Sequence, residues 1–323
     1  MKFGFIGTNW ITDRLIASGA SIEDFEPYSV YSRTMDKAKA FGDKHALKYC
    51  TDDLEAFLND PELEAVYIAT PNYIHHEQAI KALQHNKHVL CEKPVTINSE
   101  NLKAILNAEQ DSDGLFLEAM KNLYAPSFEK VKFWLETIGP VRHINFHYHQ
   151  YSSRYDKYKE GIIENAFKPE LGNGAMMDIG VYTISPLIDL FGTPESIQVS
   201  HLKLSSGADA HGSILCQYED KVANLNYSKI VDSHLPSEII GERGIIIIDK
   251  ISAPNVVQLL NRQNEVVETF ESPNPPMSYE LDHFINTVKA NDKVASKVAF
   301  KHETSIQMMQ MIDTLKTMQA LRF

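Results

Sequence analysis

Two opposite charges at the end of an apolar run form the first sequence feature that could carry chemistry. The run Val89-Leu90-Cys91 is followed directly by Glu92, Lys93 and Pro94. Proline fixes its own backbone angle and restricts the residue before it, so the chain leaves this corner in a defined direction. The stretch is therefore either an ordinary surface turn or a device that aims the Lys93 ammonium at a reacting group.

A second pair of reactive side chains follows the Gly-rich stretch LGNG. Asp178 and Tyr182 are four residues apart on a helix predicted from Ala175 to Phe191, so both lie on one helix face. A free tyrosine has a pKa of about 10, and a nearby ammonium lowers it. Lys93, Asp178 and Tyr182 thus form a candidate catalytic set for proton transfer. Alternatively, Asp178 complements a helix N-terminus and Tyr182 is a half-buried packing residue.

The first predicted turn contains part of a dinucleotide-binding fingerprint. The stretch Gly7-Thr8-Asn9-Trp10-Ile11 follows an apolar strand, and Gly7 is the one fingerprint glycine that is present, because Asn9 and Thr12 occupy the other two positions. Asparagine adopts left-handed backbone angles more readily than most residues, so a tight turn under a pyrophosphate remains possible. A plain strand-to-helix turn is the alternative.

The end of the second predicted strand bears on the choice of cofactor. An NAD site has an aspartate or glutamate at this position to bind the ribose 2′-hydroxyl, whereas an arginine suits a 2′-phosphate. This chain has Ser32 and Arg33 there, with Lys37 one helical turn later. The pattern indicates NADP, or else Arg33 is a solvated surface residue.

A third polar corner follows the next predicted strand. Thr70 and Asn72 offer a hydroxyl and an amide at its carboxyl end, Pro71 stiffens the turn, and His75 falls in the first turn of the next helix, where it is expected to face a cleft. Each residue alone would be an ordinary capping residue. Together with Glu92-Lys93-Pro94 after the following strand, they predict a cofactor site along one edge of a sheet.

The elements that position these residues change in character near residue 120. Before it, strands alternate with amphipathic helices, which predicts a parallel sheet covered on both faces. Beyond it, strands follow one another with short turns, which predicts an antiparallel or mixed sheet. We therefore expect an α/β protein with a doubly wound dinucleotide-binding domain (1–120) and an α+β domain for substrate binding and oligomerisation (121–323). The predicted elements lie at 2–6, 28–31, 34–45, 65–69, 73–85, 88–91, 99–109 and 115–118, and then at 127–137, 141–151, 175–191, 196–204, 212–218, 222–230, 237–240, 245–248, 256–260, 266–270, 279–290 and 304–320.

Composition restricts the class of protein and of partner. The 323 residues exceed what one hydrophobic core comfortably serves, and 43% hydrophobic with 23% charged residues describe a globular protein. A net charge of -12 argues against nucleic acid as the main partner. The three cysteines are widely spaced and no apolar run is long enough to span a membrane, so we expect reduced thiols and a cytoplasmic location.

Two further strands need interpretation. His147 and His149 share one strand face, but no acidic or cysteine ligand lies beside them in sequence, so we expect a polar sheet face and no metal site. The run from Ile245 to Ile248 predicts a strand that is buried on both faces, in the sheet core or in an interface.

The stretches ATPNYIHHEQAIKAL, KHVLCEKPV and GNGAMMDIGVYTI resemble the Gfo/Idh/MocA family (glucose-fructose oxidoreductase, inositol dehydrogenase and MocA) over essentially the whole chain. The resemblance implies a Rossmann domain that binds NADP or NAD, and a C-terminal domain that usually forms the oligomer interface. It also implies that Lys93 is the active-site lysine, that Glu92 helps to hold the nicotinamide, and that the Lys93-Pro94 peptide is cis.

The chain also departs from the family pattern. Many relatives have Trp-Arg where this chain has Phe167-Lys168, which leaves that contact to nicotinamide or substrate open. Tyr182 in place of histidine indicates the branch of sugar and dihydrodiol dehydrogenases. We therefore expect a homodimeric or larger NAD(P)-dependent oxidoreductase acting on a sugar, polyol or cyclic diol. The alternatives are a non-catalytic NADP-binding regulator of the same fold and redox-neutral glycoside cleavage.

Overall fold

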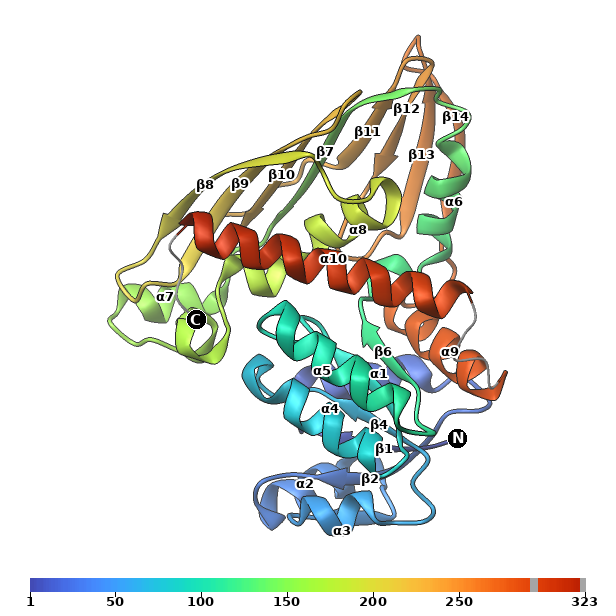
Figure 1. Cartoon of the computed structure of the whole chain (residues 1–323), viewed down its shortest axis with the longest axis vertical. Coiled ribbons are helices and arrows are strands. Elements are labelled where there is room, and N and C mark those ends of the chain that lie inside the picture. Colours follow the sequence, from blue (N-terminus) through green and yellow to red (C-terminus); the bar gives the residue numbers. More distant parts are fainter. Residues whose placement is uncertain (291–295, 320–323) are drawn as a thin grey trace. The chain divides into compact units, whose positions relative to one another are not determined.

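The computed structural model describes residues 1–290 and 296–319, which form two compact units (Figure 1). The first unit contains Met1–Ala119 and the described residues of Met277–Ile306. The second contains Met120–Pro276 and the described chain from Gln307 onward. The sequence analysis assigned all of 121–323 to the second domain, whereas in the structure the described residues of Met277–Ile306 pack with the first unit.

A six-stranded sheet forms the centre of the first unit. All its strands are parallel, and their order is β3-β2-β1-β4-β5-β6, the order of a Rossmann fold. The strands are β1 (Lys2–Ile6), β2 (Glu26–Tyr31), β3 (Tyr49–Thr51), β4 (Ala65–Ile68), β5 (His88–Glu92) and β6 (Phe116–Ala119). The helices are α1 (Trp10–Gly19), α2 (Met35–His45), α3 (Leu54–Leu58), η1 (Asn72–Ile74), α4 (His75–Gln84), α5 (Ser99–Gln110) and α9 (Pro276–Lys289).

Both faces of this sheet are covered, as its apolar strands predict. On one face Phe3 packs against Phe25 and against Phe284 of α9, with ring centroids 5.0 and 5.8 Å apart. On the other face Gly4 lies so close to α3 that a Cβ there would come within 2.4 Å of Phe57. Helix α9 therefore completes the core of the first unit, because Leu281 and Phe284 are fully buried there.

The second unit contains an eight-stranded mixed sheet of order β14-β13-β12-β11-β7-β10-β9-β8, in which β7 and β10 are parallel. The strands are β7 (Val141–His149), β8 (Ser196–Lys203), β9 (Asp209–Gln217), β10 (Val222–Ser228), β11 (Ser237–Gly241), β12 (Gly244–Ile248), β13 (Val256–Asn261) and β14 (Val266–Glu271). The helices are η2 (Lys121–Leu123), α6 (Pro126–Trp134), α7 (Ser153–Lys159), η3 (Asn165–Phe167), η4 (Pro169–Leu171), η5 (Met176–Gly180) and α8 (Val181–Phe191), while α10 (Ser296–Gln319) belongs to both units.

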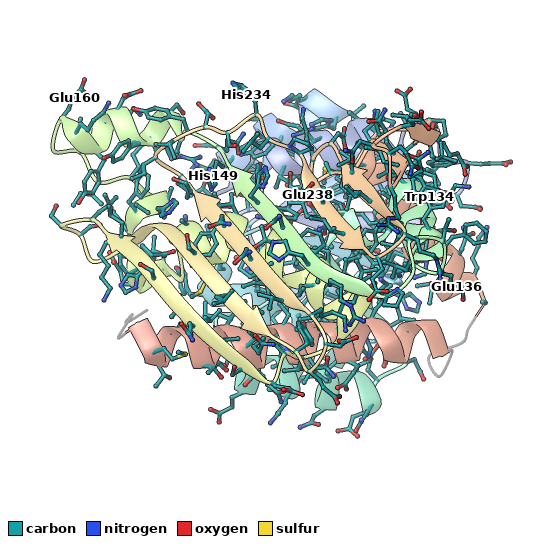
Figure 2. The ribbon with its side chains drawn as sticks, turned by 90° about the horizontal axis from the view of Figure 1, so that it is seen from above. Trp134, Glu136, His149, Glu160, His234 and Glu238 are labelled. Atoms are coloured by element: carbon teal, nitrogen blue, oxygen red, sulfur yellow. The ribbon has the colours of Figure 1, made fainter. Side chains whose placement is uncertain are left out.

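Only one face of the second sheet is packed against helices within the described part of its unit. Along β7, Ile144 and Phe146 are fully buried, whereas the alternate residues His143 and Asn145 are half-buried on the other face. Figure 2 looks onto this second face, where His149 and Glu238 are labelled. We call this surface, formed by the outward residues of β12, β11, β7, β10 and β9, the open sheet face.

The expectation that Ile245–Ile248 is buried on both faces within the sheet core is wrong, which leaves the alternative of an interface. Ile246 and Ile248 are fully buried, but Ile245 and Ile247 are half-buried. The strand alternates because helices cover one face only. Ile247 pairs with Glu238 across β11 and β12, which places its side chain on the open sheet face.

Most predicted elements are confirmed within a few residues. The sequence analysis omitted α1, β3, α3 and α7, of which β3, α3 and α7 have only three to seven residues. The predicted end of the last helix, Ala320, lies outside the described residues. No helix in the described part of the chain is long and apolar enough to cross a membrane.

Candidate active site

The residues predicted to bind a cofactor follow the strands β1, β2, β4 and β5 of the first unit. Because these strands are parallel and adjacent, Gly7, Ser32, Thr70 and Lys93 all lie at one edge of the sheet. The sheet therefore brings together residues that are up to 86 positions apart in the chain.

Gly7 is required by close packing of the backbone. Its φ is +114°, and a Cβ at this position would lie 2.5 Å from the carbonyl oxygen of Ala69. Any other residue would therefore push β1 away from the loop after β4. The buried Thr12 fixes the same turn, because its hydroxyl donates to the Gly7 carbonyl over 3.0 Å.

Asn9 plays a different role from the one that its sequence position suggested. Its φ of -97° is extended rather than left-handed, and it is the N-cap of α1. Its side-chain oxygen accepts from the N–H groups of Ile11 (3.0 Å) and Thr12 (3.4 Å), and its amide donates to Ala69 (2.6 Å). The asparagine thus occupies two of the helix donors that could bind a phosphate.

The rest of this turn is open to solvent. Thr8 is half-buried, whereas Trp10, the first residue of α1, is 58% exposed with the Arg14 guanidinium 5.5 Å from its ring centre. Helix α1 therefore presents an exposed N-terminus, with a cation close to it, at the edge where the four strands end. This geometry fits an anionic group such as a pyrophosphate.

The carboxyl end of β2 presents cations rather than an acid. Ser32 is buried and its N–H donates to Thr51 (3.2 Å). Arg33 and Lys37, in contrast, are both exposed, Arg33 just before α2 and Lys37 in its first turn. The two positive side chains lie where an adenine ribose is bound in this class of fold.

The corner after β4 is held to the corner after β5 by His75. Its two ring nitrogens lie 3.0 Å from the carbonyl oxygen of Pro94 and 2.7 Å from that of Thr70, while the Thr70 hydroxyl donates to Gln78 (2.6 Å). His75 was expected to face a cleft, but its side chain is 1% exposed and both of its ring nitrogens contact these carbonyl oxygens.

The titration of His75 follows from this burial. Desolvation lowers the pKa of His75 to about 4, although both carbonyl contacts raise it. At neutral pH the ring is therefore neutral and donates to one of its two carbonyl neighbours. Pro71 and Asn72, on the same corner, are half-buried.

The Glu92-Lys93-Pro94 corner has a cis Lys93-Pro94 peptide, as the resemblance implied. Glu92 is buried and accepts from the Tyr67 hydroxyl (2.5 Å) and from the Lys93 N–H (3.2 Å), so its carboxylate is fixed beneath the corner. Lys93 is half-buried at the tip.

A second buried carboxyl supports the same corner from β6. Glu118 accepts from the Val95 N–H (3.1 Å) and from the Ser305 hydroxyl of α10 (2.5 Å). Burial raises the pKa of Glu118 to about 7, while the Ser305 hydroxyl, the Val95 N–H and the Lys93 ammonium lower it. The turn that carries Lys93 is therefore attached to a carboxyl that titrates near neutrality.

In the second unit, Asp178 lies in a single π-helical turn, Met176–Gly180, at the start of α8. Turns of this kind often occur at functional sites. The Asp178 side chain is 40% exposed, and its carboxylate forms an ion pair with Lys229, which directly follows β10 and whose side chain is 5% exposed. The sequence analysis did not identify Lys229.

The side chain of Asp209 fixes the π-helical turn. This carboxyl is fully buried and accepts from the Met176 N–H (2.7 Å). Burial raises the pKa of Asp209 to about 6, while the Met176 N–H and the Lys229 ammonium lower it. Gly174 is required here, because its φ is +144° and a Cβ would lie 2.0 Å from an Asp209 oxygen.

Tyr182 lies one turn after Asp178 and is 5% exposed. Its ring contacts Tyr148 of β7 edge to face, with centroids 5.9 Å apart, and the Lys121 ammonium lies 5.3 Å from its ring centre. The Asn122 amide donates to the Tyr182 carbonyl (3.4 Å). Tyr182 therefore has a lysine beside it within its own unit, which sequence spacing could not reveal.

Phe167, which replaces the tryptophan of many relatives, is a packing residue. It is fully buried in a small cluster with Tyr155 and Tyr158, and the Lys229 ammonium lies 5.7 Å from its ring centre. Its aromatic face thus forms one wall around Lys229, while Lys168 is half-buried.

The histidines of β7 lie on the open sheet face. The ring of His149 is 6.1 Å from that of His147 and 5.7 Å from that of His211 on β9. Partial burial and these two neighbours lower the pKa of His149. The described residues contain no group of three histidine, cysteine or acidic side chains arranged to hold a metal ion. All three cysteines are free thiols.

The structure therefore assembles two groups of site residues. The strand ends of the first unit hold Gly7, Arg33, Thr70 and Lys93, and the start of α8 in the second unit holds Asp178 and Tyr182. The supporting residues Glu118, Asp209, Lys121 and Lys229 were absent from the sequence-based site, because they are distant in sequence from the motifs that they contact.

Comparison with known families gives two matches that follow the two units. Residues 1–119 match the oxidoreductase family with an NAD-binding Rossmann fold, and residues 128–247 match the GFO/IDH/MocA C-terminal domain.

Similar proteins with known names cover nearly the full chain. The scyllo-inositol 2-dehydrogenase (NADP(+)) IolU of Bacillus subtilis is 40% identical over 312 residues, which are 96% of this chain and 95% of that protein. The trans-1,2-dihydrobenzene-1,2-diol dehydrogenase of Xenopus laevis is 27% identical over 87% of each chain. Among solved structures, the 3-ketoreductase KijD10 of Actinomadura kijaniata with NADP and TDP-benzene has the same fold, with a TM-score of 0.84 at 21% identity over 98% of this chain and 97% of that one.

Proposed function

The chain belongs to the Gfo/Idh/MocA family of NAD(P)-dependent oxidoreductases, and from this premise we propose that it prefers NADP and oxidises or reduces a sugar, polyol or cyclic diol. The observation that carries the cofactor preference is the pair of exposed cations, Arg33 and Lys37, at the end of β2. A guanidinium binds a phosphate through two parallel hydrogen bonds, which a ribose hydroxyl cannot match. The IolU relative is itself named as an NADP(+) enzyme.

The residues of the first unit hold the cofactor. The exposed N-terminus of α1 and the tight turn at Gly7 receive the pyrophosphate, and Arg33 with Lys37 receives the 2′-phosphate. The same edge of the parallel sheet also carries the other proposed cofactor-binding residues: Thr8, Trp10, Ile11, Ser32 and the corner Thr70-Pro71-Asn72. Glu92 supports the nicotinamide end, and His75 holds the two neighbouring corners together.

The bound nicotinamide supplies the acceptor or donor of hydride at its C4 atom. Tyr182 takes the proton of the substrate hydroxyl during oxidation, or returns it during reduction. Lys93 contacts the reacting oxygen and stabilises its negative charge, and Asp178 orients the substrate by accepting a hydrogen bond from a hydroxyl. These three residues are the proposed catalytic set.

The two alternative functions, a non-catalytic regulator and redox-neutral glycoside cleavage, have less support. The named relatives include inositol, dihydrodiol and xylose dehydrogenases, and no feature of the described residues favours a non-catalytic regulator. Tyr182 instead of histidine disfavours redox-neutral glycoside cleavage. We also propose that the enzyme is cytoplasmic and assembles as a homodimer or larger homo-oligomer through the open sheet face.

The cofactor proposal is tested by replacing Arg33 with alanine. A charge-assisted hydrogen bond contributes on the order of 1.5–3 kcal/mol, so Arg33→Ala should weaken NADPH binding about tenfold or more and leave NADH binding nearly unchanged. Fluorescence titration of both cofactors measures this effect. Lys39→Ala, which also removes an exposed cation of α2, is the matched control. Equal affinities of the unmodified protein for NADPH and NADH would refute the preference.

The substrate proposal is tested with a panel of aldoses, inositols, other polyols and vicinal diols, each offered with NADP and with NAD. Turnover of at least one neutral polyhydroxylated compound is expected. Absence of turnover across the whole panel by a protein that binds NADPH would contradict the enzymatic function.

A further inference from the structure

The buried lysine after β10 has no role in the proposal above, although it contacts one of its catalytic residues. Lys229 is 4% exposed, and its ammonium forms an ion pair with the Asp178 carboxylate. A buried ammonium is costly unless a partner compensates it, so such a residue is kept in place by what it pairs with.

The surroundings of Lys229 leave it little freedom. Its N–H donates to Ala210 (2.8 Å), and its carbonyl accepts from Ser152 (2.9 Å), which fixes the backbone on both sides. Its ammonium lies 5.7 Å from the ring centre of the fully buried Phe167, which provides an apolar and cation-attracting wall. The side chain is therefore aimed at the π-helical turn.

Asp178 is fixed from two directions as a result. Its backbone turn is attached to the buried Asp209 through the Met176 N–H, and its carboxylate is attached to Lys229. Yet Asp178 is also the exposed residue of this turn, because Met176, Met177, Ile179 and Gly180 are all buried. One end of the carboxylate is thus held by a rigid cation while the side chain still reaches solvent.

A carboxylate held in this way is a directional hydrogen-bond acceptor. The ion pair with Lys229 restricts rotation about the two side-chain torsions of Asp178, and so restricts where its acceptor oxygens lie relative to the Tyr182 hydroxyl on the same helix face. A loss of position of about 1 Å can reduce turnover about a hundredfold, so a residue that removes this freedom affects catalysis without touching substrate.

We propose that Lys229 is a positioning residue of the substrate site, which orients the Asp178 carboxylate to accept a hydrogen bond from a hydroxyl group of a neutral polyhydroxylated substrate. This inference rests on the proposed function. It assigns the positive charge of Lys229 to the neutralisation of Asp178, so that the pair as a whole is uncharged and suits a neutral polyol.

The test is a double-mutant cycle of Lys229→Met and Asp178→Asn, measured with a polyol that the unmodified protein turns over. Lys229→Met should lower kcat/KM ten- to a hundredfold, while the dissociation constant of NADPH changes less than twofold. Lys229→Arg should recover part of the loss, because a guanidinium can still pair with the carboxylate. In the Asp178→Asn background, Lys229→Met should cause no further loss, since the residue acts through Asp178.

Lys130→Met is the matched control, because it removes a lysine that is paired with Glu268 (2.6 Å) on β14, which four other strands separate from β10 in the sheet. It should leave kcat/KM unchanged. If Lys229→Met is too unstable to purify, kcat/KM is instead compared among Lys229→Arg, Lys229→Gln and the double mutant Lys229→Met/Asp178→Asn. The double mutant has lost both charges of the pair, so it buries no unpaired charge.

The outcomes separate the two proposals. The positioning role would be overturned if Lys229→Met lowered kcat/KM as much in the Asp178→Asn background as in the unmodified protein. It would also be overturned if Lys229→Met lowered thermal stability but left the kinetic constants unchanged. In both cases the oxidoreductase function would stand. Absence of turnover in the unmodified protein would overturn the proposed function itself, and this inference with it.

Discussion

The two sheets of the molecule differ in how they are covered, and their site residues differ accordingly. The parallel sheet of the first unit is buried on both faces, so its polar groups are found where the strands end. The mixed sheet of the second unit is covered on one face, and its polar site residues start the helix that covers it. A sheet that is covered on both faces leaves only its edge for binding other molecules. A sheet that is covered on one face also leaves its other face for this.

Both units nevertheless support their site residues with a buried carboxyl that accepts a backbone N–H. Glu118 accepts from Val95 beside Lys93, and Asp209 accepts from Met176 beside Asp178. In both cases burial raises the pKa and a nearby lysine ammonium lowers it. The pKa of Glu118, with Lys93 nearby, is about 7, and that of Asp209, with Lys229 nearby, is about 6. The first unit should therefore be the more sensitive to pH near neutrality.

The largest expected effect concerns Lys93 and Tyr182, the residues that we propose for proton transfer. Lys93→Met and Tyr182→Phe should each lower turnover by about two to four orders of magnitude, the range for a lost acid-base element, with NADPH binding nearly intact. Their double mutant should be little worse than either single mutant, because groups that act as a unit are not additive. Turnover of a working substrate at several pH values measures the effect.

A control for this experiment is Lys81→Met, which removes a lysine that is ion-paired with Glu55 (2.8 Å) and largely exposed. It should behave as the unmodified protein. Full activity in Lys93→Met would show that the Glu92-Lys93-Pro94 corner is only a turn, and the contribution of the first unit would then be limited to the cofactor.

A smaller effect is expected from the buried carboxyl of the first unit. The pKa of Glu118 is raised from 4.5 to about 7 in the folded state, so the folded protein binds more protons than the unfolded chain between these values. Stability should therefore fall as pH rises from about 4.5 to 7, by about 3 kcal/mol at most, and level off above. Glu118→Gln, which keeps an acceptor for Val95, should remove this contribution and be more stable than the unmodified protein at pH about 8.

Urea unfolding at several pH values measures this difference. Glu23→Gln removes an exposed carboxyl of the same unit and should leave the pH dependence unchanged. If Glu118→Gln and the unmodified protein lost stability in parallel over the whole pH range, Glu118 would not be the titrating group. The expected difference in pH sensitivity between the two units would then be contradicted.

The smallest expected effect concerns the uncovered face of the second sheet. Its half-buried isoleucines Ile245 and Ile247, together with neutral Asn145 and Asn224, are unusual for a surface that only meets water. We expect a second copy of the chain to cover this face. Ile247→Lys should weaken dimerisation about tenfold or more, as measured by light scattering over a range of concentrations.

The control for this variant is Phe133→Lys, which places the same charge at a 70% exposed apolar residue of α6, a helix that contacts β13 and β14 from the covered side. It should leave assembly unchanged. An unmodified protein that is a monomer at every concentration would contradict the dimer.

Local pattern was sufficient for most of the fold. Alternation of strands and helices before residue 120 predicts the parallel sheet, and successive strands after it predict the mixed sheet. The motif residues Gly7, Lys93 and Tyr182 were found because strand ends and helix spacing are readable along the chain. The sheet-core position of Ile245–Ile248 was mispredicted, because an apolar run looks the same whether the chain itself covers one face or both faces of the strand.

The sequence by itself therefore determined the family, the order of elements and the identity of the polar corners, since these depend on contacts between residues that are near in sequence. Only the tertiary structure decided which charges stand beside them. Glu118 lies 25 positions from Lys93, Lys229 lies 51 positions from Asp178, and Lys121 lies 61 positions from Tyr182. Their effects depend on burial and on distances of a few ångströms, and neither quantity is encoded in spacing along the chain.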